Sequence, residues 1–144
     1  MIGIDTNIFL YARLQDSPCH ASAVAFLEGQ GQNRDIVISE LVLLELYLLL
    51  RNERVLMPPL SPSEAVAECG ILRAHPHWQL VESADVMAEV WPLAGMEGFA
   101  RRKIVDVRLA KTLQAHGVVD FATANTKDFE GLGFRRVWNP LLTE

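Results

Sequence analysis

The chain has 144 residues, of which 13 are Lys or Arg and 18 are Asp or Glu, so its formal net charge is 13 − 18 = −5. Half of the residues are hydrophobic, which is enough to build a buried core and excludes an intrinsically disordered chain. The length is that of one domain, and we expect residues 1–144 to form it. The acidic balance excludes a protein that coats nucleic acid by positive charge alone. An acidic enzyme can still meet a polyanion through bound cations.

No targeting or membrane-spanning segment is predicted. Asp5 interrupts the start of the chain before the apolar region of a signal peptide could form. The longest apolar stretch, residues 41–50, contains Glu45 and is far shorter than the roughly 20 residues that a transmembrane helix needs. Cys19 and Cys69 are isolated and lack metal-type spacing. We therefore expect free thiols in a reducing cytoplasm and no disulfide.

The first half of the chain predicts alternating strands and helices. A short apolar run that ends in Asp5 is typical of a buried strand. Ser17 and Pro18 predict an N-cap and a first-turn proline for a helix that runs to about Glu28. The expected elements are a strand at 1–5, helices at 7–14 and 18–28, a strand at 35–39 and a very apolar helix at about 40–51.

The second half continues this alternation after a proline-rich loop at 57–62. Ser61 and Glu64 form a capping box around a proline, and Gly117 predicts the end of a later helix. Ser83 is expected to cap a helix that ends between Leu93 and Met96. The expected elements are helices at 61–75, 83–93 and 104–116, strands at 78–82, 118–123 and 136–138, and a turn at 126–130. Alternating strands and helices imply a parallel sheet that is covered on both faces.

Asp5 is the first of three acidic residues with an unusual setting. It ends the first strand, and ligands of open α/β sheets bind at the carboxyl ends of the central strands. Capping of the following helix by Asp5 or Thr6 accounts for the position equally well. Asn7 adds a polar group that suits either a site or a turn.

Glu45 is the second. Its helix is apolar all round, so we expect the helix to be buried on most faces. The residues one turn before and after Glu45 are all apolar, so none of them can form an ion pair with it. A lone buried carboxylate is costly unless it is paired or bound to a metal. Alternatively, Glu45 pairs with a cation from another element, stays protonated, or lies on a locally exposed strip of its helix.

Asp106 is the third, and it shares one helix face with the apolar residues three, four and seven positions later. Arg102 and Lys103 precede it and could neutralise it, or it could serve the start of the helix. Three such acids from separate elements suggest a shared site. Converging carboxylates repel one another unless cations lie among them, and hard oxygen ligands select Mg²⁺ or Mn²⁺. The four histidines have no zinc-type spacing.

Four segments, in the expected order and at the expected distances, resemble the PIN-domain ribonucleases and most closely the VapC-type toxins of bacterial toxin–antitoxin pairs. The segments are Ile4–Phe9, Ser39–Leu46, Asp106–Ala110 and Ala122–Phe129. The resemblance covers nearly the whole chain. It implies a three-layer α/β sandwich with a central, mostly parallel, five-stranded sheet and helices on both faces.

The resemblance also implies roles for individual residues. The catalytic, metal-binding acids would be Asp5, Glu45 and Asp106. Asn125 would be a weaker ligand, because some family members have a charged aspartate there, and the number of ions, one or two, stays open. The residues that orient these ligands or a water would be Thr6, Asn7, Thr123 and Asp128, although Asp128 could also be a simple turn residue.

The implied activity is Mg²⁺- or Mn²⁺-dependent hydrolysis of RNA phosphodiesters by an endoribonuclease, with 5′-phosphate and 3′-hydroxyl products. The implied partners are an RNA substrate, a small antitoxin and a second copy of the chain in a cytoplasmic homodimer. A basic rim that holds RNA would comprise Arg101, Arg102, Lys103 and Lys127, although such a charge run can also be ordinary solvated surface.

Three other functions remain open at this point. A PIN-like domain that has lost catalysis could bind RNA or protein, and Asn125 is the feature that favours this. The chain could instead be a housekeeping RNA-processing nuclease. A phosphatase or receiver-type acid pocket is disfavoured, because those sites need clustered aspartates after the first strand and only Asp5 stands there.

Overall fold

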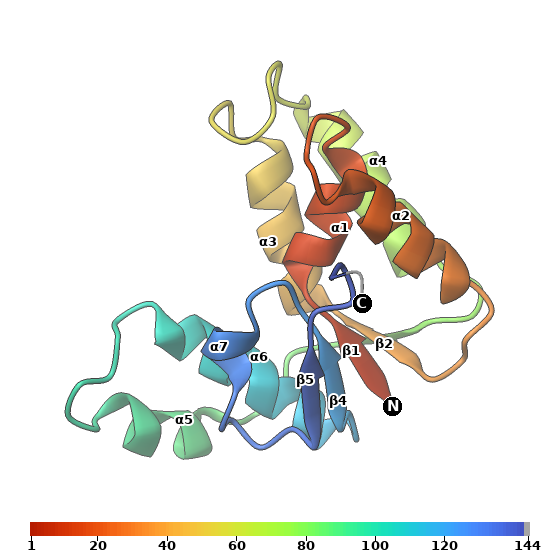
Figure 1. Cartoon of the computed structure of the whole chain (residues 1–144). Helices are drawn as coiled ribbons and strands as arrows, with labels where there is room; N and C mark the ends of the chain where they lie inside the picture. The colour runs from red at the N-terminus through yellow and green to blue at the C-terminus, as the bar shows by residue number, and fades with distance from the viewer. Residues whose placement is uncertain (143–144) are drawn as a thin grey trace.

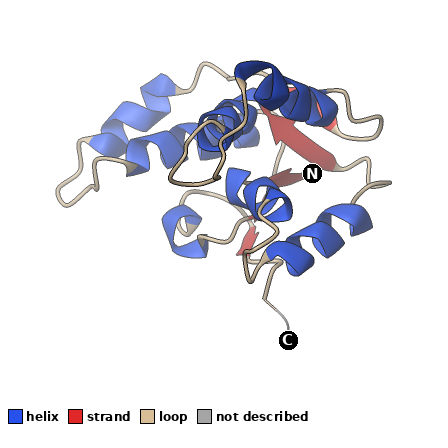
Figure 2. Cartoon of the chain, turned by 90° about the horizontal axis from the view of Figure 1, so that it is seen from above, coloured by secondary structure: helices blue, strands red, loops and turns tan. Residues whose placement is uncertain are grey.

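The computed structural model describes residues 1–142, which form a five-stranded, all-parallel sheet with helices on both faces (Figures 1 and 2). The sheet order is β3-β2-β1-β4-β5. The strands are β1 (Ile2–Ile4), β2 (Ile36–Ser39), β3 (Gln79–Val81), β4 (Asp120–Ala122) and β5 (Arg136–Trp138). This architecture confirms the expected α/β sandwich.

The helices fall into two groups in Figure 1. In that view α1 to α4 stand above the carboxyl ends of the central strands, and α5 and the start of α6 project to the lower left. Their bounds are α1 (Thr6–Arg13), α2 (His20–Gly29), α3 (Glu40–Leu50), α4 (Pro62–Arg73), α5 (Met87–Ala94), α6 (Lys103–Ala115) and α7 (Thr126–Phe129). Within residues 1–142 no helix has both the length and the apolar character to cross a bilayer.

The central strand β1 lies between β2 and β4, and its register positions the functional residues. Ile4 pairs with Ala122 of β4, so the residues that follow these two strands, Asp5 and Thr123, leave the sheet at the same edge. Ser39 ends β2 at this edge and caps α3 through its side chain. Because parallel strands end at a common edge, residues from distant parts of the sequence meet there.

The sheet core explains why β1 contains a glycine. A Cβ at Gly3 would come within 3.1 Å of side-chain carbons of both Leu113 and Phe121. Phe121 and Leu113 are almost completely buried, as are Ile4 of β1 and both isoleucines of β2. Gly3 therefore allows α6 and β4 to pack closely against the central strand.

Three expectations about local structure are wrong. The helix predicted to follow Ser17 begins at His20, because Ser17 instead accepts a hydrogen bond from the Cys19 backbone in a turn. Ser83 does not cap α5, whose N-cap is Val86, a residue held in place by its buried side chain. The segment 126–130, predicted as a turn, contains the short helix α7.

Other local predictions are confirmed. Ser61 and Glu64 form the predicted capping box of α4, with a proline in its first turn. Gly117 follows α6 with a φ of +87°, the left-handed conformation expected of a residue that ends a helix. Both cysteines are free thiols, Cys19 half-buried and Cys69 buried.

Candidate active site

Asp5 is the buried centre of the candidate site, with only 6% of its surface exposed. It is the N-cap of α1, and its Oδ1 accepts a hydrogen bond from the Thr6 backbone at 2.8 Å. Its second oxygen, Oδ2, accepts hydrogen bonds from Thr123 Oγ1 at 2.6 Å and Asn7 Nδ2 at 3.3 Å. Asp5 therefore has two roles. One oxygen caps α1, and the other joins a hydrogen-bonded cluster with Thr123 and Asn7.

Thr123, which follows β4, connects to the residues that follow β1 at this site. Its completely buried hydroxyl donates to Asp5 and accepts from the Asn125 backbone at 3.0 Å and from Asn7 Nδ2 at 3.3 Å. Asn7 Oδ1 in turn accepts from the Ala124 backbone at 3.1 Å. The predicted orienting residues Thr123 and Asn7 thus fix the carboxylate of Asp5.

Glu45 lies beside this cluster but is exposed, so the prediction of a buried carboxylate is wrong. Thr6 Oγ1 donates a hydrogen bond to Glu45 Oε2 at 3.2 Å, which ties α3 to the start of α1. Two nearby leucines of α3 are also exposed, with 63% of Leu44 and 62% of Leu48 accessible. One face of the apolar helix α3 is therefore surface, and Glu45 lies on a locally exposed strip.

Asp106 reaches the site from the first turn of α6 and is half-buried. Burial raises its pKa to about 6, with further contributions from the negative charges of Asp128 and Glu45, while Lys103 acts in the opposite direction. The positive charge of Lys103 thus favours the ionised form of Asp106, which is one of the two roles that the sequence left open. Asp128, on the short helix α7, contributes more to this shift than Glu45 does.

Burial also raises the pKa of Asp5 to about 6. The hydrogen bonds from Thr123 and Thr6 lower this pKa, and the negative charges of Glu45 and Asp106 raise it. The three predicted acids therefore interact electrostatically, although they come from three separate elements. Their mutual repulsion is a physical reason for a cation to bind among them.

The donor set fits a hard divalent cation by its chemistry, because it consists of carboxylate oxygens. Within residues 1–142, however, no three Asp, Glu, His or Cys side chains lie close enough together to hold an ion as they stand. Glu45 is exposed and Asp106 half-buried, so neither carboxylate is enclosed in the core. Asn125 is exposed and contributes its backbone N–H to Thr123.

A groove of about 310 Å³ between α3 and α6 adjoins the acids. Glu45 and Asp106 are part of its lining. The remaining lining residues are Leu41, Leu44, Leu48, Val105, Arg108 and Leu109. The sequence did not predict this groove, because α3 was expected to be buried. The sequence feature that could have indicated an exposed face is Glu45, because a charged residue lies there on the same helix face as Leu41 and Leu48.

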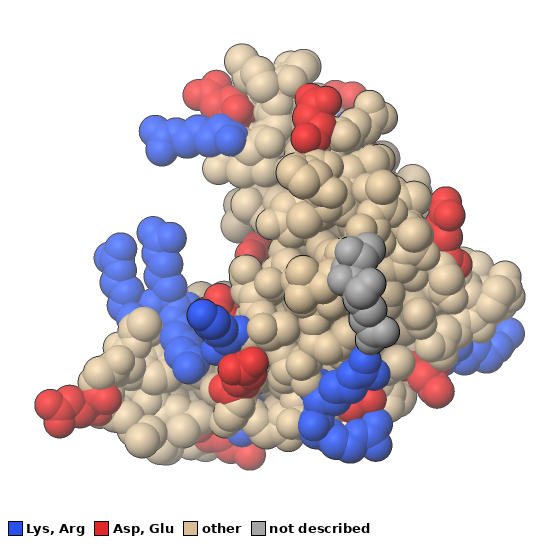
Figure 3. Space-filling model, viewed as in Figure 1, with Lys and Arg blue, Asp and Glu red and all other residues tan. Residues whose placement is uncertain are grey.

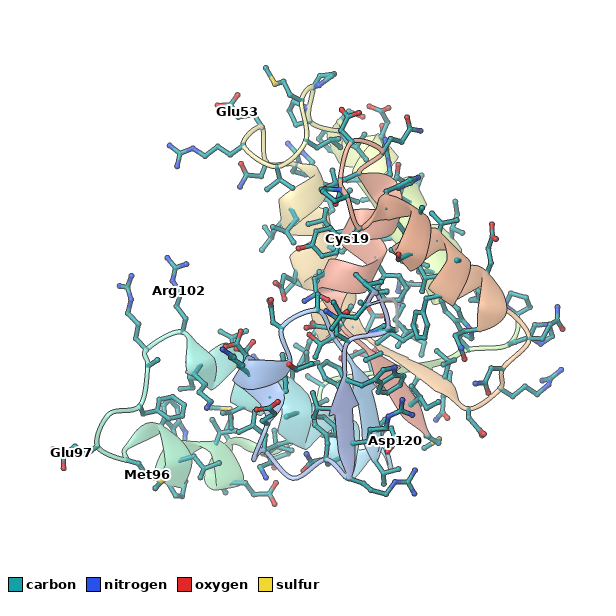
Figure 4. All side chains as sticks on the ribbon, in the orientation of Figure 1. Cys19, Glu53, Met96, Glu97, Arg102 and Asp120 are labelled. Atoms are coloured by element: carbon teal, nitrogen blue, oxygen red, sulfur yellow. The ribbon has the colours of Figure 1, made fainter. Side chains whose placement is uncertain are left out.

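Of the four predicted rim residues, Arg102 can be located directly in the figures. Figure 3 shows a broad hollow between the upper helices and the lower-left projection, with Lys and Arg side chains along its lower border. In Figure 4, Arg102 extends from the loop before α6 toward this hollow. Arg101, Arg102 and Lys127 are exposed, and Lys103 is half-buried.

Comparison with known proteins identifies the family and its fold. The family model described as the PIN domain matches residues 2–135. Two solved structures share the fold over nearly the whole chain. VapC20 from Mycobacterium tuberculosis, described as a sarcin–ricin loop cleaving toxin, superposes with a TM-score of 0.68 at 18% identity and covers 93% of this chain and 96% of its own. FitAcB from Neisseria gonorrhoeae has a TM-score of 0.68 at 21% identity and covers 99% and 100%.

The chain therefore belongs to the PIN-domain family. Within that family it is similar to ribonuclease VapC24 from Mycobacterium tuberculosis, with 48% identity over 144 residues that cover 100% of this chain and 99% of the relative. The predicted resemblance to VapC-type proteins is confirmed. Membership of this family excludes the alternative in which Asp5 belongs to a phosphatase or receiver-type acid pocket.

Proposed function

We propose that this chain is a metal-dependent endoribonuclease and the toxin of a toxin–antitoxin pair. The observation that carries the proposal is the buried, hydrogen-bonded Asp5 with two further acids, Glu45 and Asp106, whose charges act on it. Full-length similarity to a protein named as a ribonuclease supports RNA as the substrate class. Our proposal assigns the catalytic role to these three acids.

The residues that would hold Mg²⁺ or Mn²⁺ are Asp5, Glu45 and Asp106. Asn125 offers an amide oxygen without a charge, so it is the weaker ligand. A bound divalent ion would lower the pKa of a coordinated water and stabilise negative charge on the scissile phosphate. Asp128 acts on Asp106 from α7 and would add negative charge on that side of the site.

The chain's own polar residues prepare the acids for this task. Thr123 and the Thr6 backbone donate to Asp5, and these hydrogen bonds favour its ionised form. Thr6 Oγ1 holds one oxygen of Glu45 at the start of α1. Asn7 fixes the loop after β4 through the Ala124 backbone. Two of the three acids, Asp5 and Glu45, are thereby held by hydrogen bonds, and no nucleophilic side chain is required.

RNA would lie along the hollow, with its backbone held by Arg101, Arg102, Lys103 and Lys127. The antitoxin would cover the exposed leucines of the α3–α6 groove, which adjoins the acids, and would thereby block the site. Structural neighbours that include a toxin–antitoxin complex from Klebsiella pneumoniae support such a partner. The homodimer and the cytoplasmic location remain predictions, and light scattering on the purified protein tests the dimer.

Cleavage assays test the enzyme. Asp5→Asn, Glu45→Gln and Asp106→Asn should each reduce RNA cleavage in Mg²⁺ by more than about 100-fold, since loss of a group that only supports a metal ligand already costs about 10–100-fold. Glu28→Gln, which alters an exposed acid on α2, is the matched control and should retain activity. Wild-type activity in all three variants would show that the site is wrongly assigned.

A binding experiment separates the enzyme from a non-catalytic module, the alternative that Asn125 favours. An enzyme should bind Mn²⁺ and lose that binding when Asp5 is replaced, whereas a pure adaptor should bind no ion at this site. Expression of the chain with and without the adjacent open reading frame, with growth as the readout, then separates a toxin from a housekeeping nuclease.

A further inference from the structure

The groove between α3 and α6 contains a cationic side chain that has no role in the mechanism above. Arg108 is exposed and lines the groove together with Glu45 and Asp106. Among residues 1–142 it is the one Lys or Arg of the groove lining, and it takes part in none of the ion pairs found there. An arginine that lines the same groove as two carboxylates and forms an ion pair with neither is available to an anion from outside.

Helix geometry explains why Arg108 does not neutralise Asp106. Asp106 and Arg108 are two residues apart, which corresponds to a rotation of about 200° around the helix axis. Their side chains therefore leave α6 in different directions. Val105 and Leu109, which also line the groove, lie on the side of α6 between them. Asp106 and Arg108 therefore lie on different sides of α6 within the groove lining, with apolar side chains between them.

We propose that Arg108 binds a phosphate of the RNA adjacent to the one that is cleaved. This inference rests on the proposed nuclease function, since it names a substrate-binding residue of the same site. RNA carries one phosphate per nucleotide, so a phosphate at the acids is followed by another farther along the strand. The planar guanidinium of arginine donates two parallel hydrogen bonds to such a phosphate.

The position of Arg108 distinguishes its role from that of the basic rim. Arg101 and Arg102 come from the loop before α6 and border the hollow, where they can hold any part of a long backbone. Arg108 is in the middle of α6, on a rigid element and within the groove that adjoins the acids. A contact from this position sets which phosphodiester enters the site, and it therefore affects every cleavage event.

The test measures the rate of cleavage of a dilute, fluorescein-labelled RNA oligonucleotide of mixed sequence, in Mg²⁺, over a range of KCl concentrations. Arg108→Ala should lower kcat/KM by about 10-fold, mainly through KM, and should reduce the slope of its logarithm against the logarithm of salt by about 0.7, the value for one lost phosphate contact on a single strand. Arg108→Lys keeps the charge and should retain the wild-type slope.

Arg34→Ala is the matched control, because Arg34 is an exposed arginine that precedes β2, at the opposite end of the strands from the acids. If the wild-type chain cleaves RNA and Arg108→Ala behaves like Arg34→Ala in both rate and slope, the inference is overturned. It is also overturned if Arg108→Ala lowers kcat with an unchanged slope, or weakens only antitoxin binding. An inactive wild-type chain would instead refute the proposed function.

Discussion

Without metal ions, the protein should become less stable as the pH rises through the weakly acidic range. The pKa of Asp5 is about 6 in the folded chain, against an ordinary value of 3.8. The folded state therefore holds this proton more tightly than the unfolded state does. The resulting stabilisation is complete below the unfolded pKa and is lost as the pH rises through the folded pKa.

The size of the effect follows from the two pKa values. A difference of roughly two pKa units corresponds to about 3 kcal/mol over the full pH range, and about 1.4 kcal/mol of it falls between pH 5 and pH 8. Asp106 shifts in the same direction but is only half-buried, so solvent screening limits its share to less than about 1 kcal/mol. Against a typical total of about 5–15 kcal/mol, the loss is readily measurable.

Urea unfolding in a chelator at pH 5 and pH 8 provides the assay. The matched control is Asp5→Asn, which keeps the shape of the side chain but does not titrate. Comparing the two proteins isolates Asp5 from other groups, such as His75, whose pKa is lowered by burial and which acts in the opposite direction. The wild type should lose about 1.4 kcal/mol more than the variant between these pH values. Equal pH dependence in both proteins would refute the reasoning.

Three further predictions concern single contacts. Thr123→Val removes the hydrogen bond to the ionised Asp5 and should lower the unfolding free energy at pH 8 by about 2 kcal/mol, whereas Thr123→Ser should retain most of it; equal urea midpoints for the two variants would contradict this. Gly3→Ala should destabilise the folded state by about 1–3 kcal/mol and lower the Tm, because the added methyl group overpacks against Leu113 and Phe121. Gly29→Ala places its methyl group in open space and should not lower the Tm in this way. Ser61→Ala breaks the capping box of α4 and should cost about 1 kcal/mol in thermal unfolding, and an unchanged Tm would show that the cap is dispensable.

The sequence was a good guide where one local signal determines the structure. The capping box at Ser61 and the helix stop at Gly117 depend only on neighbouring residues, and both were predicted correctly. The alternation of strands and helices was enough to predict the parallel sheet. Asp5 could be placed at a strand end because the apolar run stops there. A site was expected at that position because the carboxyl ends of parallel strands share one edge.

The failures arose where distant packing decides the outcome. The apolar composition of α3 cannot say which face meets the core, and the exposed strip around Glu45 depends on the position of α6 across the groove. Ser83 has the chemistry of an N-cap, but the buried side chain of Val86 sets the start of α5 later. The hydrogen bond from Thr123 to Asp5 joins residues 118 positions apart, so no local pattern could reveal it.

The central place of β1 in the sheet has a consequence for synthesis of the chain. β1 is translated well before one of its two neighbours, β4, which begins at Asp120. Until then β1 has an unpaired edge, Gly3 lacks Phe121 above it, and Asp5 lacks its bond from Thr123. Such long-range parallel pairing forms slowly. Asp5 therefore reaches its buried, hydrogen-bonded position only after β4 has been translated and paired, and under the proposed function no cleavage would occur before then.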